Sequence, residues 1–450
     1  MKRPEQRPPS RVRLRKHLNA DALIDTVRSE FERLPDPRCV CPRIPVADVA
    51  MSAFAMFSLK DPSLLAFEKR WTARDHNLRT LYKIGEIPAD STMREVLDEV
   101  SPTKLRPAFR AVFRQLQRGK ALEELTIMDG HLLLALDGTG TFSSQKLHSG
   151  FCLQKTDSKT GKTTYYLQAM GGAFVHPDFK EVLPLPPELI CREDGTTKND
   201  CERNAAKRFL VQLKAEHPHL KIIVTEDALS PNAPHVDLLK LLDYRFILGV
   251  KPGDHEFLFE KADEAVKSGQ ALEFEYPDPA DPDIIHYFRF VNDLPLNKSR
   301  QDLRVNFLEY WQNTRKGTLR FSWITDFVIT RENAYTLMRA GRARWKIENE
   351  TFNTLKNQGY HMEHNYGLGK KHLSSVFLSI MMLAFLVDQV QQLCCPLFRA
   401  IWKKLESKRD LWERMRALFY DFELQSMHMV YEALFYGYKK LAPEIDYDST

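Results

Sequence analysis

The chain has 450 residues, of which 43% are hydrophobic and 28% charged, so it can bury a large core divided among two or three structural units. The N-terminus is basic and leads into a polar, proline-containing stretch, which excludes a secretory signal and predicts an intracellular protein. The longest apolar stretch, 376–387, is too short to span a bilayer comfortably and is interpreted as a buried helix. The seven cysteines lack paired metal-ligand spacing, which argues against a disulfide framework or a zinc site.

The formal net charge is only +5, but basic residues are concentrated in the first twenty positions. They are Lys2, Arg3, Arg7, Arg11, Arg13, Arg15 and Lys16, against the single acid Glu5. Residues 1–20 are predicted to form a disordered basic arm. Such an arm either contacts DNA or only keeps the protein soluble, and the sequence leaves both readings open.

Residues 21–120 are predicted to form a helical domain. Apolar residues recur there at three- and four-residue spacings, as in Leu23, Val27, Phe31 and Leu34, and proline clusters separate the helices. The domain is rich in arginine and lysine, which makes it a candidate DNA-binding module. These residues are Arg70, Arg74, Arg79, Lys83, Arg94, Lys104, Arg106, Arg110, Arg114, Arg118 and Lys120.

The pattern changes to strands between 121 and 252. Strands are predicted at 132–136, 165–175, 181–185, 221–225 and 245–250, with a helix at 200–216. This order suits a mixed sheet covered by helices, and it would form the first part of an α/β core. Gly171 and Gly172 indicate a bulge or a close backbone approach in the second strand.

Residues 253–330 are again rich in strands and are interpreted as a β insertion. A second part of the core is predicted at 331–395, beginning with one or two helices at 331–357. Residues 396–450 are predicted to be a C-terminal helical region.

Three acidic residues in different local settings are the strongest functional signal. Asp137 follows the apolar run 132–136, and Asp227 closely follows the apolar run 222–224, so both are expected at strand ends on one edge of the sheet. Glu348 lies in a helical stretch instead. Carboxylates from two strand ends and one helix can hold two Mg²⁺ ions, which prefer oxygen ligands and leave positions for phosphate and water.

Each of these residues has a competing interpretation. Asp137 could bond its own backbone in an Asp-Gly turn, and Asp129 is its nearest rival. Asp227 could cap a helix or form a turn, with Glu226 as the rival carboxylate. Glu348 could pair with Arg344 four residues earlier, and Glu350 remains open in its place.

The segment around Glu348 also offers contacts for DNA. Arg344 is expected to bind phosphate through its planar fork, and Trp345 is a candidate for stacking on an unpaired base. The further candidates for the DNA backbone are Arg342, Lys346, Lys356, Lys370 and Lys371. For a single lysine, a solvated helix surface would give the same pattern.

These motifs resemble the DDE transposases of bacterial insertion sequences, within the group that has an RNase H-like core and a β insertion before the final glutamate. The resemblance rests on LDGT at Asp137, EDA at Asp227 and the Arg-Trp-x-Ile-Glu run that ends at Glu348, and it covers 125–371. Family members often carry a Tyr-x-x-Arg-x-x-x-Glu-x6-Lys signature. Gly341 stands here at the tyrosine position, and Leu355 stands at the lysine position with Lys356 next to it.

The resemblance implies an RNase H-like mixed sheet with flanking helices, a β-strand insertion and an N-terminal helical domain. It implies a transposase that cleaves the ends of its element and joins them to target DNA with two Mg²⁺ ions, for which Mn²⁺ can substitute. It also implies that the protein binds double-stranded DNA and forms a homodimer in the DNA complex. The implied location is the nucleoid in the bacterial cytoplasm, with no membrane partner. Two rivals remain: a nuclease without strand transfer, and a non-catalytic DNA-binding regulator. A metabolic enzyme is disfavoured because no dinucleotide, Walker or nucleophile motif is present.

Overall fold

The protein is described by a computed structural model that covers residues 15–38, 42–72, 75–190, 201–315, 317–405 and 407–437. The chain divides into two compact units, one formed by 1–121 with 354–450 and the other by 122–353. Most of the expected basic arm, residues 1–14, lies outside the described residues. The two units are described separately below and are called the helical unit and the sheet unit.

The helical unit is built around two apolar helices, α2 and α12, that pack against each other. Every residue of α2 is buried, which accounts for its almost continuous run of apolar and small residues. The α-helices of this unit are α1 Ala20–Phe31, α2 Val46–Leu59, α3 Leu64–Thr72, α4 His76–Thr80, α5 Asp90–Asp98, α6 Arg106–Arg118, α12 Leu373–Cys394, α13 Pro396–Lys404, α14 Lys408–Asp421 and α15 Met427–Tyr436; α11, Asn353–Asn357, begins at the boundary and lies mostly in it. The predicted helical character of the N-terminal region is therefore confirmed.

Among the described helices, α12 alone is long and apolar enough to cross a membrane by length and composition. Within the protein, 89% of this apolar stretch is buried. The helix contacts α1, α2, α5 and α6, so its apolar residues are used in the core of the helical unit. The expectation of a buried helix at 376–387 is confirmed.

Two arginines of the expected DNA-binding set, Arg70 and Arg106, are buried in this unit. The guanidinium of Arg70 is fully buried and forms ion pairs with Asp61 at 2.9 Å and Asp75 at 2.8 Å. Burial opposes the charge, but these carboxylates raise the pKa of Arg70 above its ordinary value. Arg70 is thus a structural residue and cannot reach DNA.

Asp98 at the end of α5 holds the start of α12. Its carboxylate accepts backbone N–H bonds of 2.8–3.0 Å from Lys370, Lys371, His372 and Leu373. Partial burial alone would raise the pKa of Asp98, but these four bonds lower it below its ordinary value. The carboxylate acts as a cap supplied by another helix.

Asp98→Ala is expected to destabilise the protein by about 1–2 kcal/mol, the usual cost of losing a helix cap. Because the folded pKa is lowered, this stabilisation is present above pH 4 and is lost as the pH falls through the folded pKa. Urea unfolding at pH 7 and pH 3 checks both statements. Glu99→Ala is the matched control, since Glu99 makes only an exposed ion pair with Lys371 and its loss should matter little. An equal loss in both variants, or a loss that does not depend on pH, would contradict the cap.

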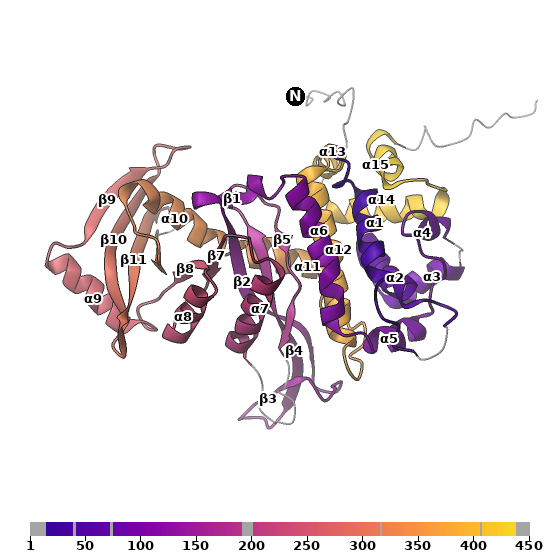
Figure 1. Ribbon diagram of the computed structural model, residues 1–450, viewed down its shortest axis with the longest axis horizontal. Helices are drawn as coiled ribbons and strands as arrows, with labels where there is room; N and C mark the ends of the chain where they lie inside the picture. Colours follow the sequence, from indigo (N-terminus) through magenta and orange to yellow (C-terminus); the bar gives the residue numbers. More distant parts are fainter. Residues whose placement is uncertain are drawn as a thin grey trace, which may run out of the picture. The chain divides into compact units, whose positions relative to one another are not determined.

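The sheet unit contains one twisted mixed sheet of twelve strands. Nine of them follow the order β3-β4-β2-β7-β8-β12-β11-β10-β9, and the short strands β1, β5 and β6 pair at its side, β1 with β2 and both β5 and β6 with β4. β2 runs antiparallel to β4 and parallel to β7, and β7 is parallel to β8. Helix α7 connects β6 to β7 and contacts β2 and β4, and α8 connects β7 to β8 (Figure 1). This order agrees with the predicted RNase H-like mixed α/β core.

The strands of this unit are β1 Thr126–Ile127, β2 His131–Ser144, β3 Leu153–Thr156, β4 Thr163–Val175, β5 Leu183–Pro184, β6 Glu188–Ile190, β7 Ile222–Glu226, β8 Arg245–Gly249, β9 Leu272–Pro277, β10 Ile285–Asn297, β11 Arg300–Thr314 and β12 Gly317–Thr325. The helices are α7 Glu202–Glu216, α8 Ala233–Leu241, α9 Glu256–Lys267 and α10 Arg331–Ala343. The expected β insertion is present, with α9 as an addition. Its strands continue the core sheet, because β12 pairs antiparallel with β8.

Two expectations need correction. β2 does not end near Leu136, because it continues to Ser144 by pairing with the long strand β4. The second part of the core was expected at 331–395, but residues from 354 onward belong to the helical unit. The reason is that α12 buries its apolar surface against the N-terminal helices.

The expected close approach at Gly171 and Gly172 is confirmed. A Cβ atom at Gly172 would overlap the ring of Phe209 on α7, and one at Gly171 would overlap the ring of Phe352. These glycines let aromatic side chains lie directly on the backbone of β4.

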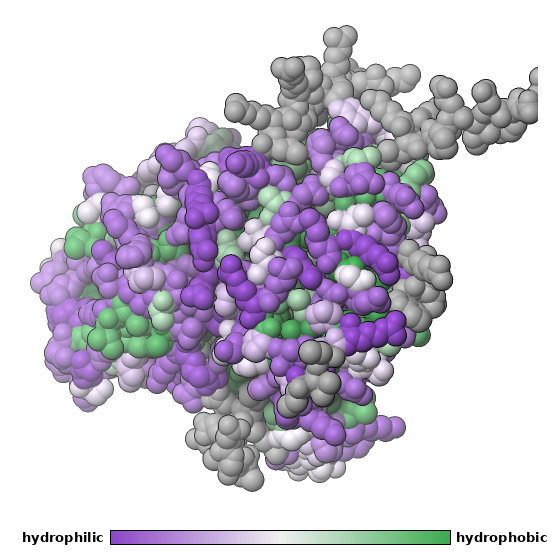
Figure 2. Space-filling model, turned by 45° about the vertical axis from the view of Figure 1, so that its right-hand side comes forward, coloured by the Kyte–Doolittle hydropathy of each residue, from purple (hydrophilic) through white to green (hydrophobic). Residues whose placement is uncertain are grey.

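The face of the protein in Figure 2 is mostly hydrophilic, with scattered hydrophobic patches.

Candidate functional site

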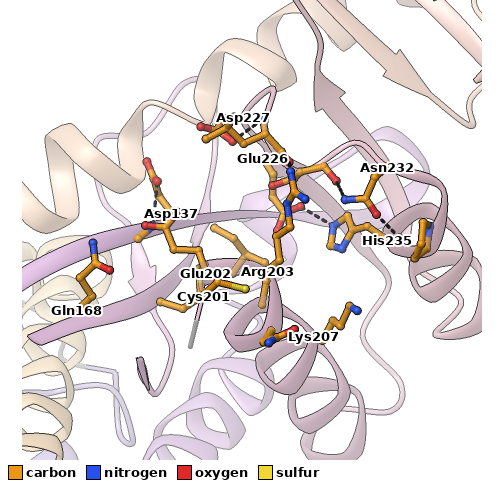
Figure 3. A pocket seen from close by; sticks show the side chains of 18 residues that line it. Asp137, Gln168, Cys201, Glu202, Arg203, Lys207, Glu226, Asp227, Asn232 and His235 are labelled. Carbon is orange, nitrogen blue, oxygen red and sulfur yellow. Dashed lines mark hydrogen bonds and ion pairs between the residues drawn. The ribbon is translucent and has the colours of Figure 1, made fainter. Parts of the chain in front are cut away.

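Asp137 and Asp227 occupy equivalent positions on two neighbouring parallel strands. Ala135 of β2 pairs with Thr225 of β7, and each aspartate lies two residues further along its own chain. Asp227 immediately follows β7, whereas Asp137 lies within β2 opposite Gly171 of β4. Side chains two residues apart share one face of a strand, so the two carboxylates are neighbours. Both line a cavity of about 620 Å³ (Figure 3).

The electrostatics of Asp137 reflect this neighbour. Burial raises its pKa above the ordinary value, and the negative charge of Asp227 adds to that effect. Arg344 opposes it through an ion pair, with Nη1 3.1 Å from Oδ2 of Asp137. The carboxylate also accepts a bond from the N–H of Gly138 at 2.9 Å, so part of the expected turn chemistry is present. The site therefore places two carboxylates together and pairs one of them with Arg344, while Arg203 and Lys207 also line the cavity.

Glu202 is a third carboxylate at this place, and the sequence did not indicate it. It begins α7, and a Cβ atom at Gly138 would overlap its Oε1 atom. Burial raises the pKa of Glu202, and the charges of Asp137 and Asp227 raise it further. Figure 3 shows Glu202 beside Asp137 at the cavity. The helix was predicted, but acidic residues are common in the first turn of a helix, so nothing in the sequence singled out Glu202.

Glu348 has a different environment. It is exposed in Ile347–Phe352, a π-helical segment that contacts β2 and β4. Within the described residues its carboxylate makes no hydrogen bond or ion pair, and Arg344 binds Asp137 instead of Glu348. Its rival Glu350 is half-buried and lies near Lys346. The structure thus brings two of the three predicted carboxylates together.

The alternatives to the two aspartates are less suitable. Asp129 is exposed just before the start of β2. Because six residues of a strand extend about 20 Å, His131 at the start of β2 is already about that far from Asp137, and Asp129 precedes it. Glu226 is buried and forms an ion pair with His235 at 2.5 Å. Asp227 accepts a backbone bond from Leu229 at 3.1 Å, yet it remains half-buried at the cavity.

The donor set fits a hard divalent cation in part. Mg²⁺ is commonly held by one or two carboxylates while water and substrate phosphates fill its other positions. Asp137 and Asp227 provide that number. Burial and, to a smaller extent, the charge of Asp227 raise the pKa of Asp137, and a bound cation would oppose both effects. In the described part of the chain, however, no three acidic, histidine or cysteine side chains are positioned together to hold a metal ion.

Several predicted DNA contacts adjoin Asp227. A second cavity, of about 740 Å³, is lined by Asp227 together with Arg342, Arg344 and Trp345. Trp345 is 47% exposed, and the guanidinium of Arg344 lies 4.9 Å from the centre of its ring. Lys251, Arg289 and Arg320 also line this cavity, together with the acids Glu226, Asp263 and Glu309. Glu309 forms ion pairs with both Arg289 and Arg320. The predicted polar segment therefore faces an aromatic cavity of mixed charge, in which Arg342 and Arg344 lie on the same wall as Asp227.

The four lysines predicted to contact DNA do not line the cavity beside Asp227. The ammonium of Lys346 donates to the carbonyl oxygens of Pro177 and Phe179, which ties it to the loop after β4. Lys356, Lys370 and Lys371 belong to the helical unit. Lys371 forms an exposed pair with Glu99, and Lys356 pairs with Glu363 at 3.1 Å.

Comparison with known proteins gives likenesses to solved structures only. No protein-family description and no curated protein matches the chain. Among solved structures, the chain resembles the piggyBac transposase in a synaptic complex with hairpin DNA. The sequence identity is 11% and the TM-score 0.38, and the alignment covers 96% of this chain and 82% of that chain. Likeness at that level establishes neither the family of this chain nor its chemistry.

Proposed function

We propose that the chain is a DNA transposase that cleaves phosphodiesters at the ends of its element and transfers the freed strands to target DNA. The observation that carries the proposal is the register of Asp137 and Asp227 on parallel strands of an RNase H-like sheet. The cavity that adjoins Asp227 also presents Arg342, Arg344 and the exposed ring of Trp345, which suit a phosphate and an unpaired base.

The residues have distinct roles in this proposal. Asp137 and Asp227 would hold Mg²⁺, or Mn²⁺ in its place, and a bound metal pair would activate water or a 3′-hydroxyl and neutralise charge on the phosphate. Arg344, which already balances Asp137, would bind the phosphate oxygens through its fork. Trp345 and Arg342 would bind the adjoining nucleotides. A homodimer on paired DNA ends and a cytoplasmic, nucleoid location in a bacterium belong to the same proposal.

The third carboxylate is a choice between Glu348 and Glu202. Glu348 is favoured by the sequence motif, and Glu202 by its position beside Asp137 and its raised pKa. We retain Glu348 as the proposed third ligand, which requires its segment to move toward the aspartates when DNA and metal bind. Glu202 is the second candidate.

Glu348→Gln is expected to reduce Mg²⁺-dependent cleavage by about 10²-fold or more, a loss of about 3 kcal/mol of transition-state stabilisation. Glu202→Gln and Glu350→Gln are measured in the same cleavage assay, each after confirming an unchanged circular dichroism spectrum. A large loss with Glu202→Gln and none with Glu348→Gln would transfer the role to Glu202. A loss only with Glu350→Gln would transfer it to Glu350.

The function itself is tested with purified full-length protein and DNA that flanks its own gene. Mg²⁺-dependent nicking at those flanks, followed by joining of the new 3′ ends to a plasmid, supports a transposase. Cleavage without joined products would instead identify a nuclease. Specific binding without cleavage in Mg²⁺ or Mn²⁺ would identify a regulator.

A further inference from the structure

The helical unit contains a cavity that the proposed function does not use. It has a volume of about 390 Å³ and lies between the chain around 356–361 and one face of α14. The α14 residues that line it are Arg409, Trp412, Glu413 and Arg416, at the spacings of three and four that define one face of a helix. Cavities of this size accommodate small ligands.

The lining of this cavity is predominantly cationic. Of the ten described residues that line it, four are lysine or arginine, and Glu413 is the only acid in that described set. Lys60 at its base is neutralised by the buried carboxylate of Asp388. Within the described residues Lys356 forms an ion pair with Glu363, whose side chain is 63% exposed. Such an exposed pair is weak enough to exchange for another anion. Arg409 and Arg416 together leave an excess of positive charge.

Arg416 is held in place for such a role. One of its terminal nitrogens, Nη1, donates to the carbonyl oxygens of Leu59 and Lys60 at 3.0 and 2.9 Å, where α2 ends. These bonds use one end of a guanidinium that has five N–H donors. Arg416 is therefore anchored at one end with further donors at the other, which lowers the entropy lost on binding an anion.

The positive charge around the cavity also affects the pKa of His361. It lines the cavity in a left-handed backbone conformation with φ of 56°. Burial lowers its pKa, and the charges of His364, Arg416 and Arg409 lower it further. At neutral pH the imidazole is uncharged and offers a ring N–H to a ligand.

We propose that this cavity binds phosphate groups, through Lys356, Arg409 and Arg416. Phosphate is the anion that suits two forked guanidiniums and a lysine, because it accepts several charge-assisted bonds in different directions. The phosphate comes either from a nucleic-acid strand or from a free phosphate compound. The inference is independent of catalysis by the sheet unit.

Calorimetric titration of the full-length protein with sodium pyrophosphate in EDTA tests the proposal. Saturable binding is expected, weakened about tenfold by Arg409→Gln and by Lys356→Gln. Arg414→Gln is the matched control, because Arg414 lies on another face of α14 and pairs with Asp410 at 2.8 Å. Absence of saturable binding, or equal weakening by Arg414→Gln, would overturn the proposal.

The source of the phosphate is distinguished by two oligonucleotides that differ only in a 5′-phosphate. Tighter binding of the phosphorylated strand than of pyrophosphate, lost in Arg409→Gln but kept in Arg414→Gln, identifies a nucleic-acid end. Equal binding of both strands with preference for pyrophosphate identifies a free phosphate compound. Because these titrations contain no metal and require no cleavage, they can fail while the transposase proposal stands, and the reverse also holds.

Discussion

Asparagine in place of Asp137 is expected to reduce Mg²⁺-dependent cleavage and strand transfer by at least about 10³-fold, equivalent to about 4 kcal/mol of transition-state stabilisation. The substitution keeps the shape of the side chain and the bond from Gly138, but it removes the charge that a cation needs. Asp227→Asn should give a loss of the same size, because the two carboxylates occupy equivalent positions on β2 and β7.

The double variant distinguishes a shared site from two separate effects. Residues that act as one unit give grossly non-additive losses, so Asp137→Asn with Asp227→Asn should be little worse than either alone. Asp129→Asn is the matched control, since Asp129 is exposed outside the site. Full activity in Asp137→Asn, with a normal circular dichroism spectrum, would remove Asp137 from the mechanism.

Replacing Asp388 by alanine is expected to cost about 3–5 kcal/mol of unfolding free energy, a large part of the stability of a typical protein. Asp388 contacts the ammonium of Lys60 and accepts a bond from the hydroxyl of Tyr360 in the core of the helical unit. The side chain of Lys60 is fully buried, with its ammonium 3.9 Å from the centre of the Trp412 ring. Without Asp388, a buried positive charge loses its partner.

The pH dependence and a double variant check this explanation. Burial lowers the pKa of Lys60, so the unfolded chain binds more protons than the folded one near pH 10, and stability of Asp388→Ala should recover as the pH rises toward that value. Lys60→Met combined with Asp388→Leu should restore most of the lost stability, because apolar residues often replace a buried pair at little cost. Denaturant unfolding measures both. A double variant as unstable as Asp388→Ala would contradict the charge argument.

The sequence predicted those features that depend on local pattern. Alternation and apolar runs were sufficient for β4, β7 and β8, and the register of a parallel pair then placed Asp137 beside Asp227. Glu202 could not be found in this way, because its position depends on how the first turn of α7 packs on Gly138. The boundary at 354 was missed for a similar reason, since the partner of α12 is α2, more than three hundred residues earlier in the chain.

The insertion of the sheet unit within the helical unit has a consequence for synthesis. The 232 residues from 122 to 353 separate the N-terminal helices from α12, against which α2 buries its surface. At about 5–20 residues per second, the ribosome needs roughly 10–50 s to cover that distance. Throughout this interval the sheet unit can fold, while α2 and its neighbours α1 and α6, which contact one another through α1, still lack α12. We therefore expect a chain that ends before α12 to expose the apolar surface of α2 and to aggregate more readily than the full-length protein.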